Sequence, residues 1–111
     1  MNRVILFGRF GHDPSLRVTD SGVSVVSFSL ATSFKRDGID EVEWHKCVCF
    51  AKTADLVHTY FRKGDQILVE GRLKSRKGKT KGGDETSVTE ILIDNFNFVS
   101  KKRDEPDEEQ P

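Results

Sequence analysis

The sequence lacks any run of apolar residues long enough to cross a membrane as a helix, which takes about 20 residues. Residues 1–3 lead at once into a strand pattern and lack the layout of a secretory signal, so we expect a cytoplasmic protein with no membrane partner. With 111 residues and 35% hydrophobic content, the chain can fill one modest core. These limits predict a single domain.

Cysteine and histidine are also scarce, with two and three residues respectively. On a strand, the Cα atoms of Cys47 and Cys49 would lie about 6.6–6.8 Å apart, at the far limit for a disulfide. We expect both to be buried, reduced thiols. His45 would share their face, but the same spacing is too wide for easy tetrahedral zinc coordination. The pattern predicts no metal site and no cofactor, and we do not expect an enzyme because the sequence shows no catalytic constellation.

Neither sign of charge is in excess, because 18 basic residues balance 18 acidic ones. Five of the acids lie within residues 104–111, which contain no base, so the rest of the chain holds 18 basic against 13 acidic residues. A mildly basic body with an acidic tail differs from a uniformly neutral protein and is compatible with a polyanionic partner. We expect residues 1–100 to form the domain and residues 101–111 to be a disordered acidic tail.

Turn-forming residues divide the domain into stretches with strand patterns and one with a helical pattern. The expected strands, with a short extended segment at 16–18, are 3–7, 23–34, 42–50, 67–73 and 87–99. Apolar residues from Leu56 to Phe61 follow a helical spacing, which predicts a helix over 53–63. Residues 77–86 are basic, glycine-rich and unpatterned, which indicates a loop. Five strands with a helix after the third predict an all-β OB-fold, a five-stranded Greek-key barrel. An SH3-like barrel is the rival, but it does not normally insert a full helix there.

The expected third strand carries the most informative side-chain pattern. Because side chains in a strand alternate between faces, Trp44, Lys46, Val48 and Phe50 share one face, with Lys52 in line if the strand continues. Aromatic rings interleaved with cations on a rigid sheet suit a flexible anionic polymer with stackable bases. Lys46 is hard to bury, so we expect this face to meet solvent and Trp44 to be exposed.

Seven short stretches between residues 2 and 99 occur in the order found in a known family. They are Asn2-Arg3-Val4-Ile5-Leu6, Gly11-His12-Asp13-Pro14, Phe28-Ser29-Leu30-Ala31-Thr32, Glu43-Trp44-His45, Phe50-Ala51-Lys52, Arg62-Lys63-Gly64 and Val69-Glu70-Gly71-Arg72-Leu73. With them the chain resembles the bacterial-type single-stranded DNA-binding proteins of bacteria, plasmids or phages. The resemblance implies an OB-fold that binds single-stranded DNA without sequence specificity and performs no catalysis. It also implies a homo-oligomer, usually a tetramer, with a dimer as the alternative.

The resemblance also implies which rings stack on bases. Trp44 and Phe50 match two aromatic positions of the family, and Phe34 is the nearest match to a third. A fourth family aromatic commonly follows the Arg76-Lys77 pair, but Gly78 stands there in this chain. With that stacking ring absent, we expect Trp44 to carry a larger share of base contact than in relatives.

A run of six basic residues with no acid lies between residues 72 and 81. It straddles the connection between the fourth and fifth strands, one of the loops that OB-folds use for oligonucleotides. Cations at alternate positions of a strand share one face and can follow a phosphate track. The expected phosphate contacts are Arg72, Lys74, Arg76, Lys77, Lys79, Lys46, Lys52 and Arg3, and further candidates are Arg17, Arg62 and Lys63.

The leading hypothesis is a non-enzymatic protein that binds and protects single-stranded DNA during replication, recombination or repair. One rival is an RNA-preferring OB module of the cold-shock kind, although those modules have a different aromatic pattern and no such helix. The other is a protein-interaction module with weakened binding of single-stranded DNA, which Gly78 makes tenable. Family tails often end in a hydrophobic residue that recruits replication or repair proteins, whereas this sequence ends in Glu109-Gln110-Pro111.

Overall fold

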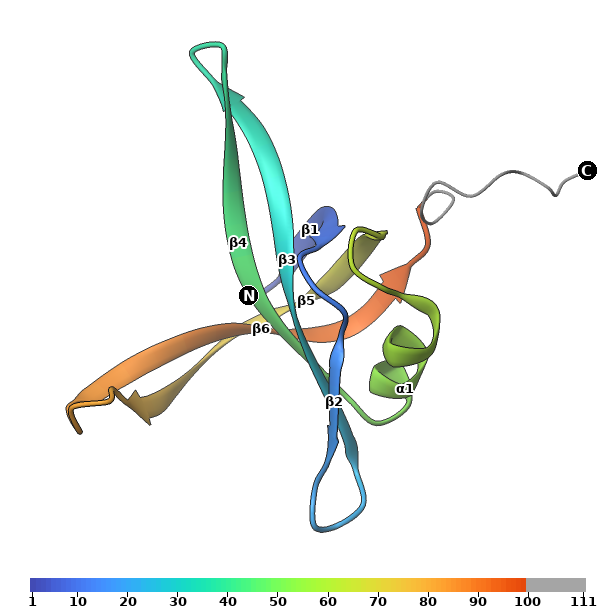
Figure 1. Cartoon of the computed structure of the whole chain (residues 1–111), viewed down its shortest axis with the longest axis vertical. Coiled ribbons are helices and arrows are strands. Elements are labelled where there is room, and N and C mark those ends of the chain that lie inside the picture. The colour runs from blue at the N-terminus through green and yellow to red at the C-terminus, as the bar shows by residue number, and fades with distance from the viewer. Residues whose placement is uncertain (100–111) are drawn as a thin grey trace, which may run out of the picture.

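The computed structural model describes residues 1–99, and the tail expected over residues 101–111 lies outside the described residues. Strands make up most of the described chain, and one helix interrupts them (Figure 1). In chain order the elements are β1 (Val4–Phe10), β2 (Ser15–Val18), β3 (Ser24–Arg36), β4 (Ile39–Phe50), α1 (Ala51–Tyr60), β5 (Gln66–Lys79) and β6 (Glu85–Asn97).

Five of these strands close into a barrel. The hydrogen-bonded order is β1-β5-β6-β4-β3-β2, and β1 also pairs with β3 where Phe10 lies opposite Leu30, which joins the two ends of the ring. β2 adds to the outer part of β3 as a sixth, short strand. The closed five-stranded barrel with α1 between β4 and β5 confirms the OB-fold expected from the sequence.

The barrel interior is filled by aromatic and branched apolar side chains. The ring of Phe10 lies 4.5 Å from that of Phe28 and 5.3 Å from that of Phe61, measured between centroids. Cys47 and Cys49 are fully buried free thiols in the same core, as expected. Burial raises the pKa of each to about 12, so both stay protonated near neutral pH and are not available as thiolate nucleophiles or ligands.

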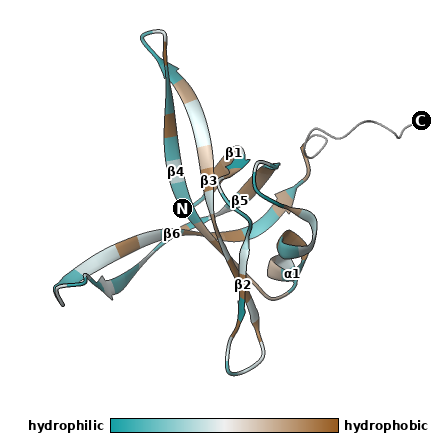
Figure 2. Cartoon of the chain, in the orientation of Figure 1, coloured by the Kyte–Doolittle hydropathy of each residue, from teal (hydrophilic) through white to brown (hydrophobic). Residues whose placement is uncertain are grey.

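Two hairpins extend beyond the barrel as long arms, one formed by β3 and β4 and the other by β5 and β6 (Figure 1). The expectation of a loop over residues 77–86 is wrong, because β5 continues to Lys79 and β6 resumes at Glu85. Arm residues such as Lys77 and Ser87 pair across the hairpin while both faces remain largely in water. A two-stranded ribbon of this kind needs no alternation of apolar and polar residues, and its sequence therefore gives no strand signal. Figure 2 shows arms that are largely hydrophilic or neutral, with isolated hydrophobic bands.

The helix begins and ends earlier than the expected range of 53–63. It starts at Ala51, directly after β4, and ends at Tyr60. Phe61 has left the helix with an extended backbone (φ −120°, ψ 147°) and is fully buried. The spacing of apolar residues in the sequence could not show that the helix ends before Phe61, because this side chain would face the core whether its backbone is helical or extended. In residues 1–99 no helix has the length and apolar character needed to cross a membrane.

Candidate nucleic-acid interface

The face of β4 that carries Trp44 and Phe50 is open to solvent over most of its length. Trp44 is 58% exposed and Phe50 is 46% exposed, while Val48 between them is buried. Across from them on β3, Ala31 lies opposite Trp44 and Val25 lies opposite Phe50. The methyl group of Ala31 is too small to cover the indole, and both rings stay accessible at fixed places on β4.

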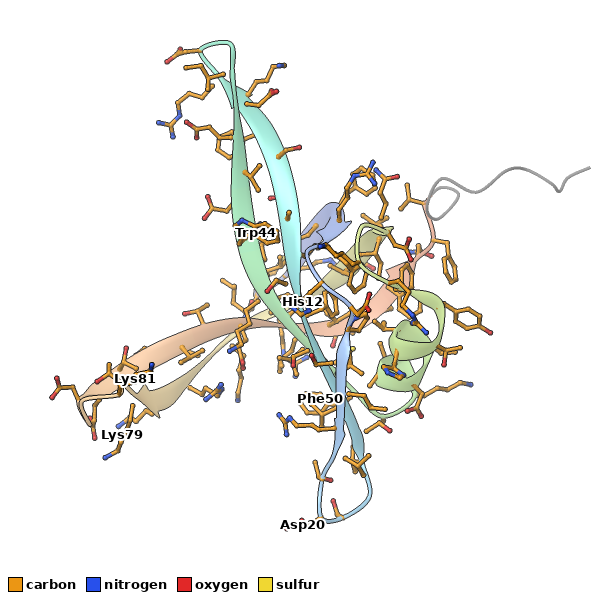
Figure 3. The ribbon with its side chains drawn as sticks, in the orientation of Figure 1. His12, Asp20, Trp44, Phe50, Lys79 and Lys81 are labelled. Carbon is orange, nitrogen blue, oxygen red and sulfur yellow. The ribbon has the colours of Figure 1, made fainter. Side chains whose placement is uncertain are left out.

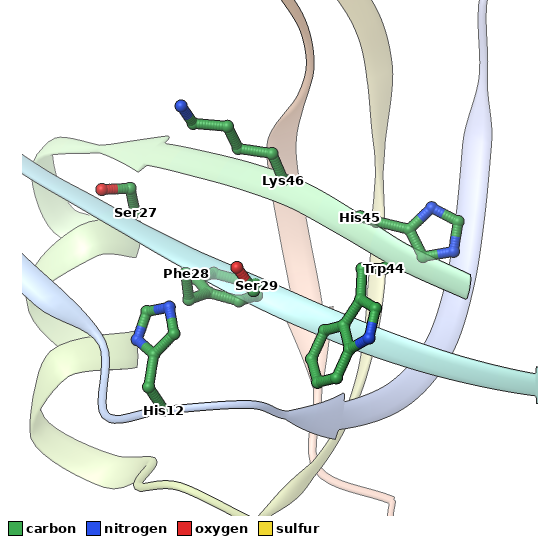
Figure 4. Close-up of a pocket in the computed structure, with 7 residues that line it drawn as sticks. All are labelled: His12, Ser27, Phe28, Ser29, Trp44, His45 and Lys46. Atoms are coloured by element: carbon green, nitrogen blue, oxygen red, sulfur yellow. The ribbon is translucent and has the colours of Figure 1, made fainter. Parts of the chain in front are cut away.

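The indole of Trp44 lies against a pocket of about 340 Å³ (Figure 4). His12, from the segment after β1, lines the same pocket, together with Lys46 and residues 27–29 of β3. The indole lies across Gly11, where an added Cβ would come within 2.4 Å of the ring. Glycine at this position therefore leaves the room that the edge of the indole needs against the segment after β1.

Phe50 lines a second pocket of about 260 Å³, which four strands build together. Arg17 comes from β2, Lys74 and Arg76 from β5, and Glu90 from β6. The pocket therefore combines one aromatic ring with three cations and one carboxylate. The ring and the cations are the combination that can hold a stacked base with its flanking phosphates, whereas the carboxylate is not part of that combination.

Ion pairs connect the two pockets. The Lys46 ammonium, which lines the Trp44 pocket, lies 3.8 Å from a carboxylate oxygen of Glu90. Arg76, which lines the Phe50 pocket, reaches the same carboxylate at 3.2 Å. The two rings, the cations and this carboxylate thus form one continuous surface, which we call the β4 track. Its members are Trp44, Lys46, Phe50, Arg17, Lys74, Arg76 and Glu90.

The structure does not bring Phe34 onto this track. Phe34 lies opposite Glu41, which is three positions before Trp44 on β4. Because side chains alternate along a strand, this odd offset points the two rings to opposite faces of the β3–β4 arm. Phe34 is 43% exposed on its own face. Stacking of a base on Phe34 stays a prediction, and it would require the nucleic-acid strand to wrap around the arm.

The expected phosphate contacts spread over several regions. Lys74 and Arg76 reach the track, whereas Arg72 pairs with Asp94 at 3.1 Å. Figure 3 shows Trp44 and Phe50 along β4, with Lys79 and its neighbour Lys81 near the end of the β5–β6 arm. The remaining candidates lie in other places: Lys77 on the arm, Lys52 on α1, and Arg3 in an ion pair with Glu70.

Two residues of the surface were not anticipated from the sequence. His12 lies in the segment between β1 and β2, whose fold gives no periodic signal. Glu90 offered a clue, because it is the only charged residue between Val88 and Ile93 in an otherwise strand-like stretch. His45 also lines the Trp44 pocket, and its Nε2 lies 2.8 Å from the Thr32 hydroxyl. Within residues 1–99 no group of three or more His, Cys, Asp or Glu side chains is placed to hold a metal ion.

Comparisons with known proteins point to one family. A model described as the single-strand binding protein family matches residues 1–99. A protein named single-stranded DNA-binding protein 1 from Chlorobaculum tepidum is 41% identical over 108 residues, which cover 92% of this chain and 67% of that protein. Proteins named single-stranded DNA-binding protein 1 and 2 from two strains of Staphylococcus aureus are each 41% identical over 105 residues. These matches cover 92% of this chain, and the chain spans 63% of the length of each S. aureus relative.

Proposed function

The chain belongs to the single-strand binding protein family, and from this premise we propose that it binds single-stranded DNA along the β4 track without sequence specificity. Bases stack on Trp44 and Phe50, while Lys46, Lys74 and Arg76 contact phosphates. Stacking accepts every base because each has a π-face, which gives affinity without selectivity. The observation that carries the proposal is the pair of exposed rings on one strand face, each lining a pocket that also contains cations.

The proposed role is to coat and protect single-stranded DNA during replication, recombination or repair, with no catalytic step. The names of the relatives and the family support DNA binding as the common property. Partner proteins from replication or repair fit this role.

Trp44 is the sole tryptophan, so intrinsic fluorescence reports directly on the proposed site. Adding oligo(dT) is expected to quench this fluorescence, because a stacked base perturbs the indole. The logarithm of the binding constant should fall linearly with the logarithm of salt concentration, with a slope of about −0.7 for each phosphate contacted. No quenching and no mobility shift at low salt would refute the proposal. Stronger binding of a matched RNA oligomer would instead support the RNA-binding alternative.

We further propose a homo-oligomer, most simply a tetramer, that assembles through the outer face of β1. Ile5 and Phe7 are 57% and 47% exposed on that face, and Phe7 lines a surface pocket of about 390 Å³ with Val42 of β4. Neighbouring exposed apolar residues of this kind are typical of subunit contacts. Light scattering is expected to give a multiple of the 12.6 kDa chain mass. Phe7→Glu should reduce that mass, because a carboxylate cannot be buried there without a partner; a monomeric wild-type protein would contradict this.

A further inference from the structure

One carboxylate lies in the middle of the β4 track. Glu90 is only 7% exposed and stands on β6 directly opposite Lys74 of β5. It lies between the Trp44 pocket and the Phe50 pocket, and it lines the second of them. An acid at the centre of a surface that attracts phosphate weakens that attraction, so its presence calls for an explanation.

The contacts of Glu90 show what the carboxylate does. Arg76 donates from Nε to Oε1 at 3.2 Å and from Nη2 to Oε2 at 3.3 Å, a two-pronged arrangement that an arginine also uses for phosphate. The Nζ atom of Lys46 lies 3.8 Å from Oε2. Lys46 and Arg76 nevertheless keep 53% and 52% of their side chains exposed, so both cations can still be reached from solvent.

We infer that Glu90 is an internal competitor of DNA phosphate, which occupies Lys46 and Arg76 when no strand is bound. This inference deepens the proposed function and depends on it. A cation that is already paired with a protein carboxylate attracts a phosphate less strongly, because the two anions share the cation and repel one another. Salt ions screen a nearly buried carboxylate less than an exposed one, so its effect persists at moderate ionic strength.

The competition between Glu90 and phosphate has a functional consequence where the bound DNA passes from Trp44 to Phe50. Binding there is weakened without any loss of stacking, so a bound strand leaves the track more readily. The opposite interpretation is that Glu90 only holds Arg76 in the right orientation for phosphate. The two interpretations predict opposite signs for the change in affinity when the charge of Glu90 is removed.

The decisive variant is Glu90→Gln, which keeps the shape and an acceptor oxygen for Arg76 but removes the negative charge. Its affinity for oligo(dT) at low salt is expected to rise about 3- to 15-fold, because one repulsive charge near the phosphate is lost. The salt slope should become steeper by about 0.7 to 1.4, as one or two further phosphates gain a full cation partner. Oligo(dT) is a suitable probe because thymine has no exocyclic amino group, which leaves its N3–H as the one base donor that could bond to Glu90.

Asp40→Asn is the matched control, since it removes the same charge from the exposed Lys35–Asp40 pair near the tip of the β3–β4 arm. Its affinity should stay within about twofold of the wild type. Wild-type protein that fails to bind oligo(dT) would refute the proposed function itself. Wild-type binding with unchanged or weaker binding by Glu90→Gln would overturn only the competitor role. Should that variant not fold, Glu90→Asp draws the carboxylate back from both cations, and binding about twofold tighter is expected; no gain would overturn the inference.

Discussion

Replacing Trp44 by alanine is expected to weaken binding of oligo(dT) by roughly 5- to 150-fold, the loss that corresponds to about 1–3 kcal/mol for one stacked base. The indole is 58% exposed and lies on the barrel surface over Gly11, so its removal takes little from the core. The melting temperature should therefore stay close to that of the wild type. Because the variant has no tryptophan, the affinity is measured by the anisotropy of a labelled oligomer.

Two companion variants sharpen the test of Trp44. Trp44→Phe keeps an aromatic face and should retain a large part of the affinity that the alanine variant loses. Ile39→Ala removes a 64% exposed apolar side chain near the tip of the same arm and should leave binding unchanged. If Trp44→Ala bound as tightly as the wild type, base stacking on this ring would be excluded. The resemblance implies a further stacking ring at the position of Gly78, and because glycine offers no ring there, a large effect at Trp44 is expected.

Alternation along single strands predicted most of the barrel. Phe28 and Leu30 of β3, and Cys47 and Cys49 of β4, lie inside as their spacing requires, while Trp44 and Lys46 lie outside. This success has a physical reason, because a strand that covers a core must separate its two faces. The two arms carry no such constraint, and the missed extension of β5 to Lys79 follows from that.

The sequence predicted only some of the residues of the β4 track, because the track is formed by strands that lie far apart in the sequence. Arg17 and Glu90 are 73 positions apart and line one pocket. The basic run pointed to Lys74 and Arg76 but could not show that a carboxylate of β6 pairs with one of them. Register decided the case of Phe34 as well, since the pairing with Glu41 turns its ring away from Trp44.

Stability should depend strongly on Phe61, the first residue after α1. Phe61→Ala is expected to lower the free energy of unfolding by about 3–5 kcal/mol, a large part of the roughly 5–15 kcal/mol typical of a domain. The ring is fully buried and stacks at 5.3 Å on Phe10 and at 5.0 Å on Phe98, with the edge of Phe96 at 5.5 Å. Its removal leaves a cavity where the helix meets the barrel, and a rigid barrel can close such a cavity only in part.

Thermal unfolding at one fixed protein concentration measures this loss, because assembly would otherwise change the apparent stability. The melting temperature of Phe61→Ala should fall by more than about 10 °C. Phe34→Ala is the matched control, since it removes the same ring from an arm position that is 43% exposed, and it should cost less than about 1 kcal/mol. A small loss in both variants would mean that the junction of α1 with the barrel contributes little to stability. A large loss at Phe61 alone would identify the aromatic cluster around it as what holds α1 against the barrel.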